Sequence, residues 1–139
     1  MINAFKKIMI VDDDSVDRWI LRRTLEKMKI TETIIESQTG AEALAVITNY
    51  SAHKEELPEL IFLDLHMPVL NGFEFLDALE QLSREYKNRC RIAVVSSIES
   101  ESDKNKSLGY ESVIGYFEKP VKEETILRMR EQLNFNQAC

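Results

Sequence analysis

Short apolar runs that recur along the chain restrict its fold more than any other feature. They lie at residues 7–11, 33–36, 60–63, 91–95 and 113–117, and their length is typical of strands. Three of them contain the sequences IMIV, LIFL and IAVV, which are apolar at successive positions instead of alternate ones. This pattern is expected when helices cover both faces of a parallel sheet. The runs therefore predict five strands of a buried parallel sheet.

Segments that favour helices separate the apolar runs. We expect helices at residues 15–29, 41–50, 73–86, 101–108 and 122–133, of which 101–108 is short and polar. The alternation of strand and helix predicts an open, doubly wound α/β fold, with a five-stranded parallel sheet and helices on both faces. The chain has 139 residues, 44% of them hydrophobic, which is enough for one sizeable core. We expect a single domain over residues 1–139, with 134–139 as a short C-terminal tail.

Charge and hydropathy exclude several classes of protein. The chain has 18 Lys and Arg residues against 24 Asp and Glu, and its net charge of −6 makes nucleic acid an unexpected partner. Its apolar runs are far shorter than the roughly 20 residues that span a bilayer, so we expect no membrane segment. Its first residues do not fit a secretory signal, and its two cysteines, Cys90 and Cys139, form no disulfide framework or C-x-x-C motif. We therefore expect a cytoplasmic protein.

Chemically useful side chains follow four of the predicted strands. Asp12 and Asp13 follow the first, Asp64 the third and Ser96 the fourth, and Lys119 lies just past the fifth. Sites in open α/β sheets lie beyond the carboxyl ends of the strands, so these residues are expected to converge. Three converging carboxylates repel one another unless a cation lies among them, and their oxygens suit Mg²⁺. Beside a lysine and a hydroxyl, such a site is typical of phosphoryl transfer, with one carboxylate as nucleophile.

Four segments of the chain together resemble the receiver domain of two-component response regulators. They are I-V-D-D at residues 10–13, L-D-L-H-M-P-V-L-N-G at 63–72, V-V-S-S at 94–97 and G-Y-F-E-K-P at 115–120. The segments occur in the family's order and near its spacing, and the resemblance covers nearly the whole chain. It implies the flavodoxin-like (βα)5 receiver fold.

The resemblance also implies a phosphoacceptor and a metal site. Asp64 matches the aspartate that receives the phosphoryl group, and Asp12 and Asp13 match the acidic pair that holds Mg²⁺ together with Asp64. The backbone carbonyl of His66 matches a further protein ligand of the metal. The side chain of His66 lies at a position that influences the lifetime of the phosphoryl group in this family.

Three further residues match the positions that bind the phosphoryl group and switch the domain. Lys119 matches the family's lysine, which acts with Asp64 in catalysis, Ser96 matches the switch Ser or Thr, and Tyr116 matches the aromatic switch residue. Ile98 matches a companion position two residues after the switch Ser or Thr, and Pro120 follows a peptide bond that is often cis in the family.

The implied function is signalling. The domain takes a phosphoryl group from a sensor histidine kinase or a histidine phosphotransfer protein, and catalyses both this transfer and its own dephosphorylation. It signals through the surface formed by residues 101–108, 113–117 and 122–133, toward a downstream protein or a second copy of itself. The few residues after 133 predict a stand-alone receiver without an effector domain.

Other interpretations remain open at this point. Residues 12–16 (D-D-D-S-V) also fit the D-x-D-x-[TV] pattern of haloacid dehalogenases, in which Asp12 is the nucleophile and Asp14 the acid. A docking-only pseudo-receiver is a further alternative, although the key acids and the lysine are present. Asp14 and Ser96 can also act as helix caps, and Tyr116 as a core residue. Nucleotide-binding P-loops, dinucleotide fingerprints and hydrolase elbows are absent from the sequence.

Overall fold

Five parallel strands form one sheet in the order β2-β1-β3-β4-β5. The structure is a computed structural model that describes residues 5–50, 53–82 and 89–138. The strands are β1 (Phe5–Val11), β2 (Thr31–Ser37), β3 (Leu60–Asp64), β4 (Arg91–Ser96) and β5 (Val113–Glu118). All five strands predicted from the apolar runs are present, so the predicted parallel sheet is confirmed.

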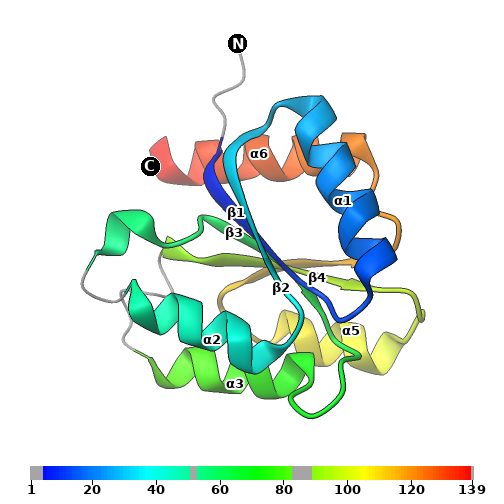
Figure 1. The fold of residues 1–139 in the computed structure, drawn as a ribbon. Coiled ribbons are helices and arrows are strands. Elements are labelled where there is room, and N and C mark those ends of the chain that lie inside the picture. Colours follow the sequence, from blue (N-terminus) through cyan, green and yellow to red (C-terminus); the bar gives the residue numbers. More distant parts are fainter. Residues whose placement is uncertain (1–4, 51–52, 83–88, 139) are drawn as a thin grey trace.

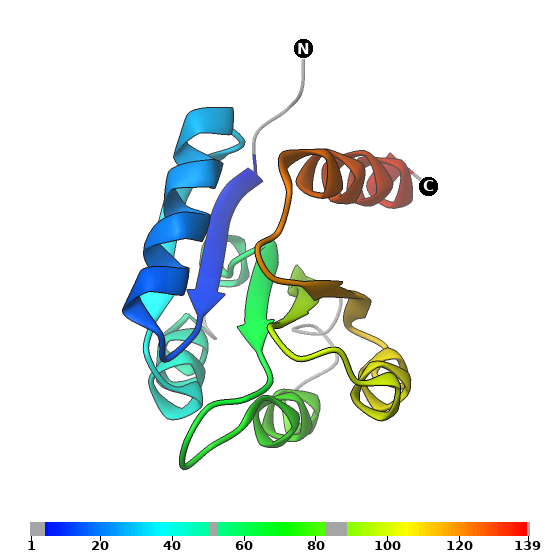
Figure 2. The ribbon, with the colours of Figure 1, turned by 90° about the vertical axis from the view of Figure 1, so that its right-hand side faces the viewer.

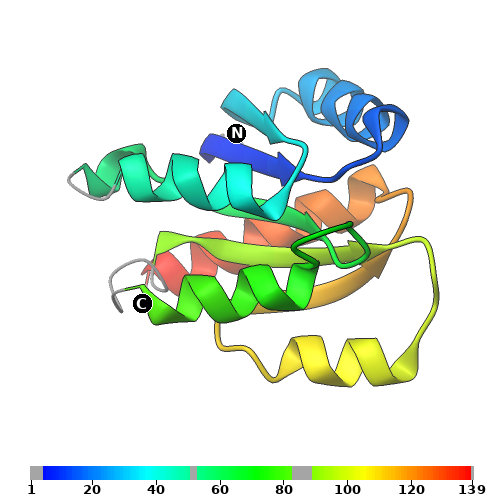
Figure 3. The same cartoon turned by 60° about the horizontal axis from the view of Figure 1, so that its bottom comes forward.

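Helices cover both faces of the sheet. They are α1 (Ser15–Met28), α2 (Gly40–Asn49), α3 (Gly72–Gln81), α5 (Glu101–Leu108) and α6 (Glu123–Ala138), with a short 3₁₀ helix, η1 (Lys54–Glu56). Helices α1 and α6 lie on one face, and α2, α3 and α5 lie on the other (Figure 1). Helices α2 and α3 run side by side (Figure 3). This arrangement confirms the doubly wound α/β fold. None of the helices in the described part of the chain is long and apolar enough to cross a membrane.

The central strands are apolar at successive positions because each of their faces has its own core layer. In β1, Ile8 and Ile10 belong to the layer under α1 and α6, whereas Met9 and Val11 belong to the layer under α2 and α3. All four side chains are buried. Because neighbouring residues of a strand point to opposite faces, a strand covered on both sides has no solvent-facing position for a polar side chain.

Polar residues fix the start of the two helices that follow β1 and β3. The side chain of Asp14 accepts hydrogen bonds from the backbone N–H groups of Val16 and Asp17 and thereby caps α1. Asn71 caps α3 in a capping box with Glu74. Asp14 is therefore a helix cap, as one of the interpretations of the sequence predicted.

Glycine allows α3 to begin directly behind the end of β3. The N–H of Gly72 donates to the carbonyl of Leu65 at 2.9 Å. A Cβ atom on Gly72 would lie 2.6 Å from the Leu65 Cα and 2.9 Å from the Asp64 carbonyl oxygen, which is too close for any side chain. In the loop between β3 and α3, Val69 is 98% exposed and has a φ of 68°, which is strained for a β-branched residue.

Two helix ends differ from the sequence prediction. Helix α3 ends at Gln81 instead of residue 86, and Leu82 follows in extended conformation; residues 83–86 of the predicted helix fall in the segment 83–88, which is outside the described residues. Helix α6 continues to Ala138, although we expected it to end at residue 133 and be followed by a tail. Residues 134–138 contain no Gly or Pro to stop a helix, so the helix continues through them.

Candidate functional site

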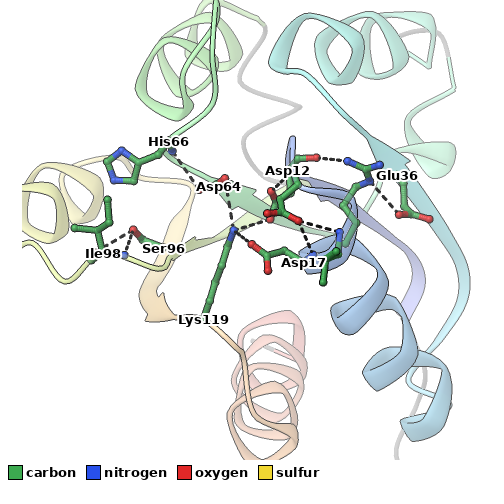
Figure 4. Close-up of polar contacts among 11 residues, drawn as sticks. Asp12, Asp17, Glu36, Asp64, His66, Ser96, Ile98 and Lys119 are labelled. Carbon is green, nitrogen blue, oxygen red and sulfur yellow. Dashed lines mark hydrogen bonds and ion pairs between the residues drawn. The ribbon is translucent and has the colours of Figure 1, made fainter.

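The carboxyl ends of four strands meet at one edge of the sheet. Asp12 follows β1, Asp64 ends β3, Ser96 ends β4 and Lys119 follows β5. Figure 2 shows β1 and β3 directed toward this edge, and Figure 4 shows the Lys119 side chain reaching between Asp64 and Asp12. The backbone N–H of Lys119 donates to the Ser96 carbonyl at 2.9 Å, so the pairing of β5 with β4 continues to the site. The Lys119–Pro120 peptide bond is cis, as the resemblance implied.

Three carboxylates surround the ammonium group of Lys119. Its Nζ lies 2.7 Å from the Oδ2 of Asp12, 2.9 Å from the Oδ2 of Asp17 and 3.5 Å from the Oδ2 of Asp64. Asp12 and Asp64 are buried, and Lys119 compensates their charge. Burial alone disfavours the charged amine, but the hydrogen bonds to Asp12 and Asp17 and the attraction of Asp64 raise the pKa of Lys119 above its ordinary value.

An acidic cluster lies beside this lysine. Carboxylate oxygens of Asp12, Asp13 and Asp64 lie within 4.8 Å of one another, and Asp13 is exposed to water. Burial raises the pKa of Asp64 from 3.8 to about 6, Lys119 lowers it and Asp12 raises it. This set of oxygen donors, open to water on one side, fits Mg²⁺, which keeps several of its own waters.

Helix α1 holds the end of β1 in place. The backbone N–H of Asp14 donates to the Oδ1 of Asp12 at 2.9 Å, and the Nη1 of Arg18 donates to the Asp12 carbonyl at 2.7 Å. The Nε of Arg18 also donates to Glu36 on β2 at 3.3 Å, and Arg22 donates to the same carboxylate. These contacts fix the backbone from which Asp12 enters the site.

Sequence reasoning missed two residues on α1, Asp17 and Arg18. Both lie in the first turn and a half of the helix that directly follows the acidic pair at 12–13. Side chains there point back toward the end of the preceding strand. Helix α1 carries several other charged residues, so the sequence has no specific signal that singles out these two.

His66 links the loop after β3 to α5. Its backbone N–H donates to the Oδ1 of Asp64 at 3.1 Å, and its Nε2 lies 3.3 Å from the Oδ2 of Asp103. The contact with Asp103 was not predicted. The role of the His66 carbonyl as a metal ligand stays a prediction.

The hydroxyl of Ser96 is engaged in its own loop. It donates to the Ile98 carbonyl at 3.0 Å and accepts from the Ile98 N–H at 3.1 Å. The hydroxyl of Tyr116 donates to the same carbonyl at 2.8 Å. Ser100, not Ser96, caps α5, so the interpretation of Ser96 as the cap of that helix is wrong. The Tyr116 side chain is half-buried and packs against the core layer under α2 and α3, so it has both a core contact and a polar one.

These contacts define what the site can do chemically. Asp64 presents a buried carboxylate next to a fixed cation and to other carboxylate oxygens that could hold a metal ion, which suits it to act as a nucleophile toward a phosphoryl group. The dehalogenase interpretation requires Asp14 as an acid, but the Asp14 carboxylate is committed to the start of α1. The geometry thus does not favour this alternative.

Comparisons with known proteins point to one family. A family model described as the response regulator receiver domain matches residues 8–131. PilH from Pseudomonas aeruginosa is 30% identical over 125 residues, which cover 88% of this chain and 92% of PilH. The sensor histidine kinase CheAY from Helicobacter pylori is 31% identical over 91 residues, or 66% of this chain. The chain spans only 10% of the length of CheAY.

Solved structures show the same fold. A two-component response regulator from Cytophaga hutchinsonii superposes with a TM-score of 0.89 at 22% identity, covering 95% of this chain and 99% of that one. A response regulator receiver protein from Dyadobacter fermentans superposes with a TM-score of 0.75 at 27% identity, covering 92% of this chain and 94% of that one. The arrangement of strands and helices described above is therefore shared across both.

Proposed function

We propose that Asp64 is the residue that accepts a phosphoryl group, because this chain belongs to the response regulator receiver domain family. The chain is the receiver of a two-component system, and we propose that residues 1–139 act as one such domain. One observation carries the assignment to Asp64. Its buried carboxylate lies 3.5 Å from the Lys119 ammonium and forms a cluster with Asp12 and Asp13.

The residues that would hold Mg²⁺ are Asp12, Asp13, Asp64 and, through its backbone carbonyl, His66. When bound, Mg²⁺ supplies positive charge that offsets the carboxylates and the oxygens of the phosphoryl group. The exposed side of the cluster, at Asp13, leaves room for the waters that this ion keeps. The chemistry of the donor set supports this part of the proposal.

The transfer itself is assigned to Asp64 and Lys119. An ionised oxygen of Asp64 attacks the phosphorus of a phosphohistidine, the new P–O bond forms as the P–N bond breaks, and the electron pair of that bond stays on the imidazole nitrogen. The Lys119 ammonium neutralises charge on the phosphoryl oxygens, and its hydrogen bond with Asp12 keeps it at the site. Later hydrolysis by water returns Asp64 to its free form, and the domain thus catalyses its own dephosphorylation.

Phosphorylation is proposed to change the surface formed by α5, β5 and α6. Ser96 and Tyr116 both donate to the Ile98 carbonyl in this structure. If Ser96 turns to donate to a phosphoryl oxygen, it leaves that carbonyl and frees space into which Tyr116 can move. Such contacts exist in one state only, so they can shift a two-state equilibrium. The changed surface would then bind a downstream protein or a second copy of the chain.

The partner that delivers the phosphoryl group is proposed to be a sensor histidine kinase or a histidine phosphotransfer protein. Matches to the kinases CheAY and, at 30% identity, one from Arabidopsis thaliana support this partner class, since part of each kinase resembles this chain. A cytoplasmic location is part of the same proposal.

Intact mass measurement tests the phosphoacceptor. After incubation with Mg²⁺ and acetyl phosphate, the wild-type protein should gain one phosphate, and Asp64→Asn should gain none while its circular dichroism spectrum is unchanged. Asp14→Asn is the matched control, because Asn also caps helices and the hydrogen bonds of the Asp14 carboxylate are to backbone N–H groups at the start of α1. Labelling of Asp64→Asn to the wild-type extent, with the phosphate mapped to Asp12, would refute the assignment.

A further inference from the structure

Lys119 is held by an acid from outside the four segments that resemble the family. Asp17, in the first turn of α1, lies 2.9 Å from the Lys119 Nζ, whereas Asp64 lies at 3.5 Å. The backbone N–H of Asp17 donates to the Asp14 cap at 3.1 Å, which fixes the position of its main chain. Figure 4 shows Asp17 and Asp12 on the same side of the ammonium group.

We propose that Asp17 is a positioning residue that holds Lys119 toward α1 before phosphorylation and competes with the phosphoryl group for it. This inference rests on the proposed function of Asp64. In this account Asp17 touches neither the phosphoryl group nor Mg²⁺ and acts only through Lys119.

The number of donors on an ammonium group limits how many oxygens Lys119 can bind at once. Lys119 has three N–H donors, and two of them are committed at hydrogen-bond distance to Asp12 and Asp17. A phosphoryl group on Asp64 adds oxygens on the opposite side of Lys119. Each step of the ammonium toward those oxygens lengthens its contacts on the α1 side.

Asp17 is the contact that gives way. Its side chain is 35% exposed, whereas that of Asp12 is 5% exposed. Water can solvate the Asp17 carboxylate when Lys119 leaves, but the buried Asp12 carboxylate needs a neighbouring cation, either Lys119 or Mg²⁺. The Lys119–Asp17 contact is therefore the easier one to break, and it is characteristic of the unphosphorylated state.

Removal of the Asp17 charge should therefore speed phosphorylation. Asp17→Asn removes a competitor for Lys119 and leaves Asp12, Asp13 and Asp64 intact. Partly exposed ion pairs are weak, so we expect the rate with acetyl phosphate and Mg²⁺ to rise roughly two- to fivefold. Asp14→Asn, which removes the same charge from the N-cap of α1, should change the rate much less.

A double-variant experiment separates positioning from a general charge effect. In a Lys119→Met background, Asp17→Asn should no longer change the rate, because the residue through which it acts is missing. If Asp17→Asn still accelerates phosphorylation in that background, or if the single variant is unchanged or slower than wild type, the inference is wrong. Should Asp17→Asn fail to fold, the same comparison is made with Asp17→Ser.

A second readout needs neither Mg²⁺ nor phosphorylation. In metal-free protein labelled with ¹⁵N-lysine, the ε-ammonium signal of Lys119 should shift in Asp17→Asn and stay in place in Asp14→Asn. An unshifted signal in Asp17→Asn would refute the contact. If wild-type protein takes no phosphate, the proposed function fails; if it takes phosphate and Asp17→Asn behaves as wild type, only the role of Asp17 fails.

Discussion

Replacement of the buried carboxylate of Asp64 should stabilise the metal-free protein at high pH. Asp64 is 5% exposed, and burial raises its pKa from 3.8 to about 6 in spite of the opposing effect of Lys119. The folded protein therefore binds a proton at Asp64 more tightly than the unfolded chain does. The favourable contribution of the protonated group is complete below pH 3.8 and is lost as the pH rises through 6.

The size of the effect follows from these two values. Each pH unit between them corresponds to about 1.4 kcal/mol, so the loss at pH 8 is at most about 3 kcal/mol. Asn has the shape of Asp without its charge, and its amide oxygen can still accept from the His66 N–H. Asp64→Asn should therefore be more stable than wild type at pH 8 by up to about 3 kcal/mol, which corresponds to about 10 °C in Tm for a domain of this size.

Urea unfolding in the presence of a chelator measures this difference at pH 8 and pH 4. The free energy of unfolding of Asp64→Asn should exceed that of wild type by a large amount at pH 8 and by a small amount at pH 4. Asp14→Asn should show no such pH-dependent difference from wild type. Addition of Mg²⁺ at pH 8 should then stabilise the wild type more than Asp64→Asn, because a ligand that binds the folded state stabilises it. An equal gain at both pH values, or none at pH 8, would show that burial of this charge does not limit stability.

Three further predictions follow from the same contacts. The initial rate of phosphorylation by acetyl phosphate should fall as the pH is lowered from 6 toward 3.8, because a protonated Asp64 cannot attack and bound Mg²⁺ lowers its pKa below the metal-free value of about 6; a rate that stays constant down to pH 3.8 would argue against Asp64 as nucleophile. Gly72→Ala should destabilise the protein by roughly 1–3 kcal/mol in urea unfolding, because its Cβ would collide with the backbone of Leu65, and wild-type stability would contradict that clash. A beryllofluoride mimic of phosphorylation should change amide exchange in residues 101–133 more than in 41–58, and equal changes in both segments would exclude the proposed output surface.

Simple physical rules explain which strands and which site residues could be predicted from the sequence. The strands were found because a strand covered on both faces must be apolar throughout, as Ile8 to Val11 show. Asp12, Asp64 and Lys119 were predicted to converge because the carboxyl ends of parallel strands share an edge. The acidic cluster and the ion pairs of Lys119 confirm that convergence.

Contacts that depend on the reach of individual side chains were not predictable. Asp17 lies on a helix whose apolar pattern gives no reason to look at it, and its contact with Lys119 depends on how α1 packs against the end of β5. The same holds for His66 and Asp103, which come from a loop and a helix that are distant in sequence. The end of α6 that we predicted at residue 133 was wrong. The apolar pattern ends there, but residues 134–138 contain no residue that stops a helix.

The hydrogen bond between Lys119 and Asp12 joins residues 107 positions apart. A ribosome makes Asp12, Asp13 and Asp64 long before it makes Lys119. Until β5 docks beside β4, a growing chain therefore holds its acids without the lysine that compensates them. A chain therefore becomes able to accept a phosphoryl group only at the end of its synthesis. Unfinished chains cannot take part in signalling, even when most of their sheet has formed.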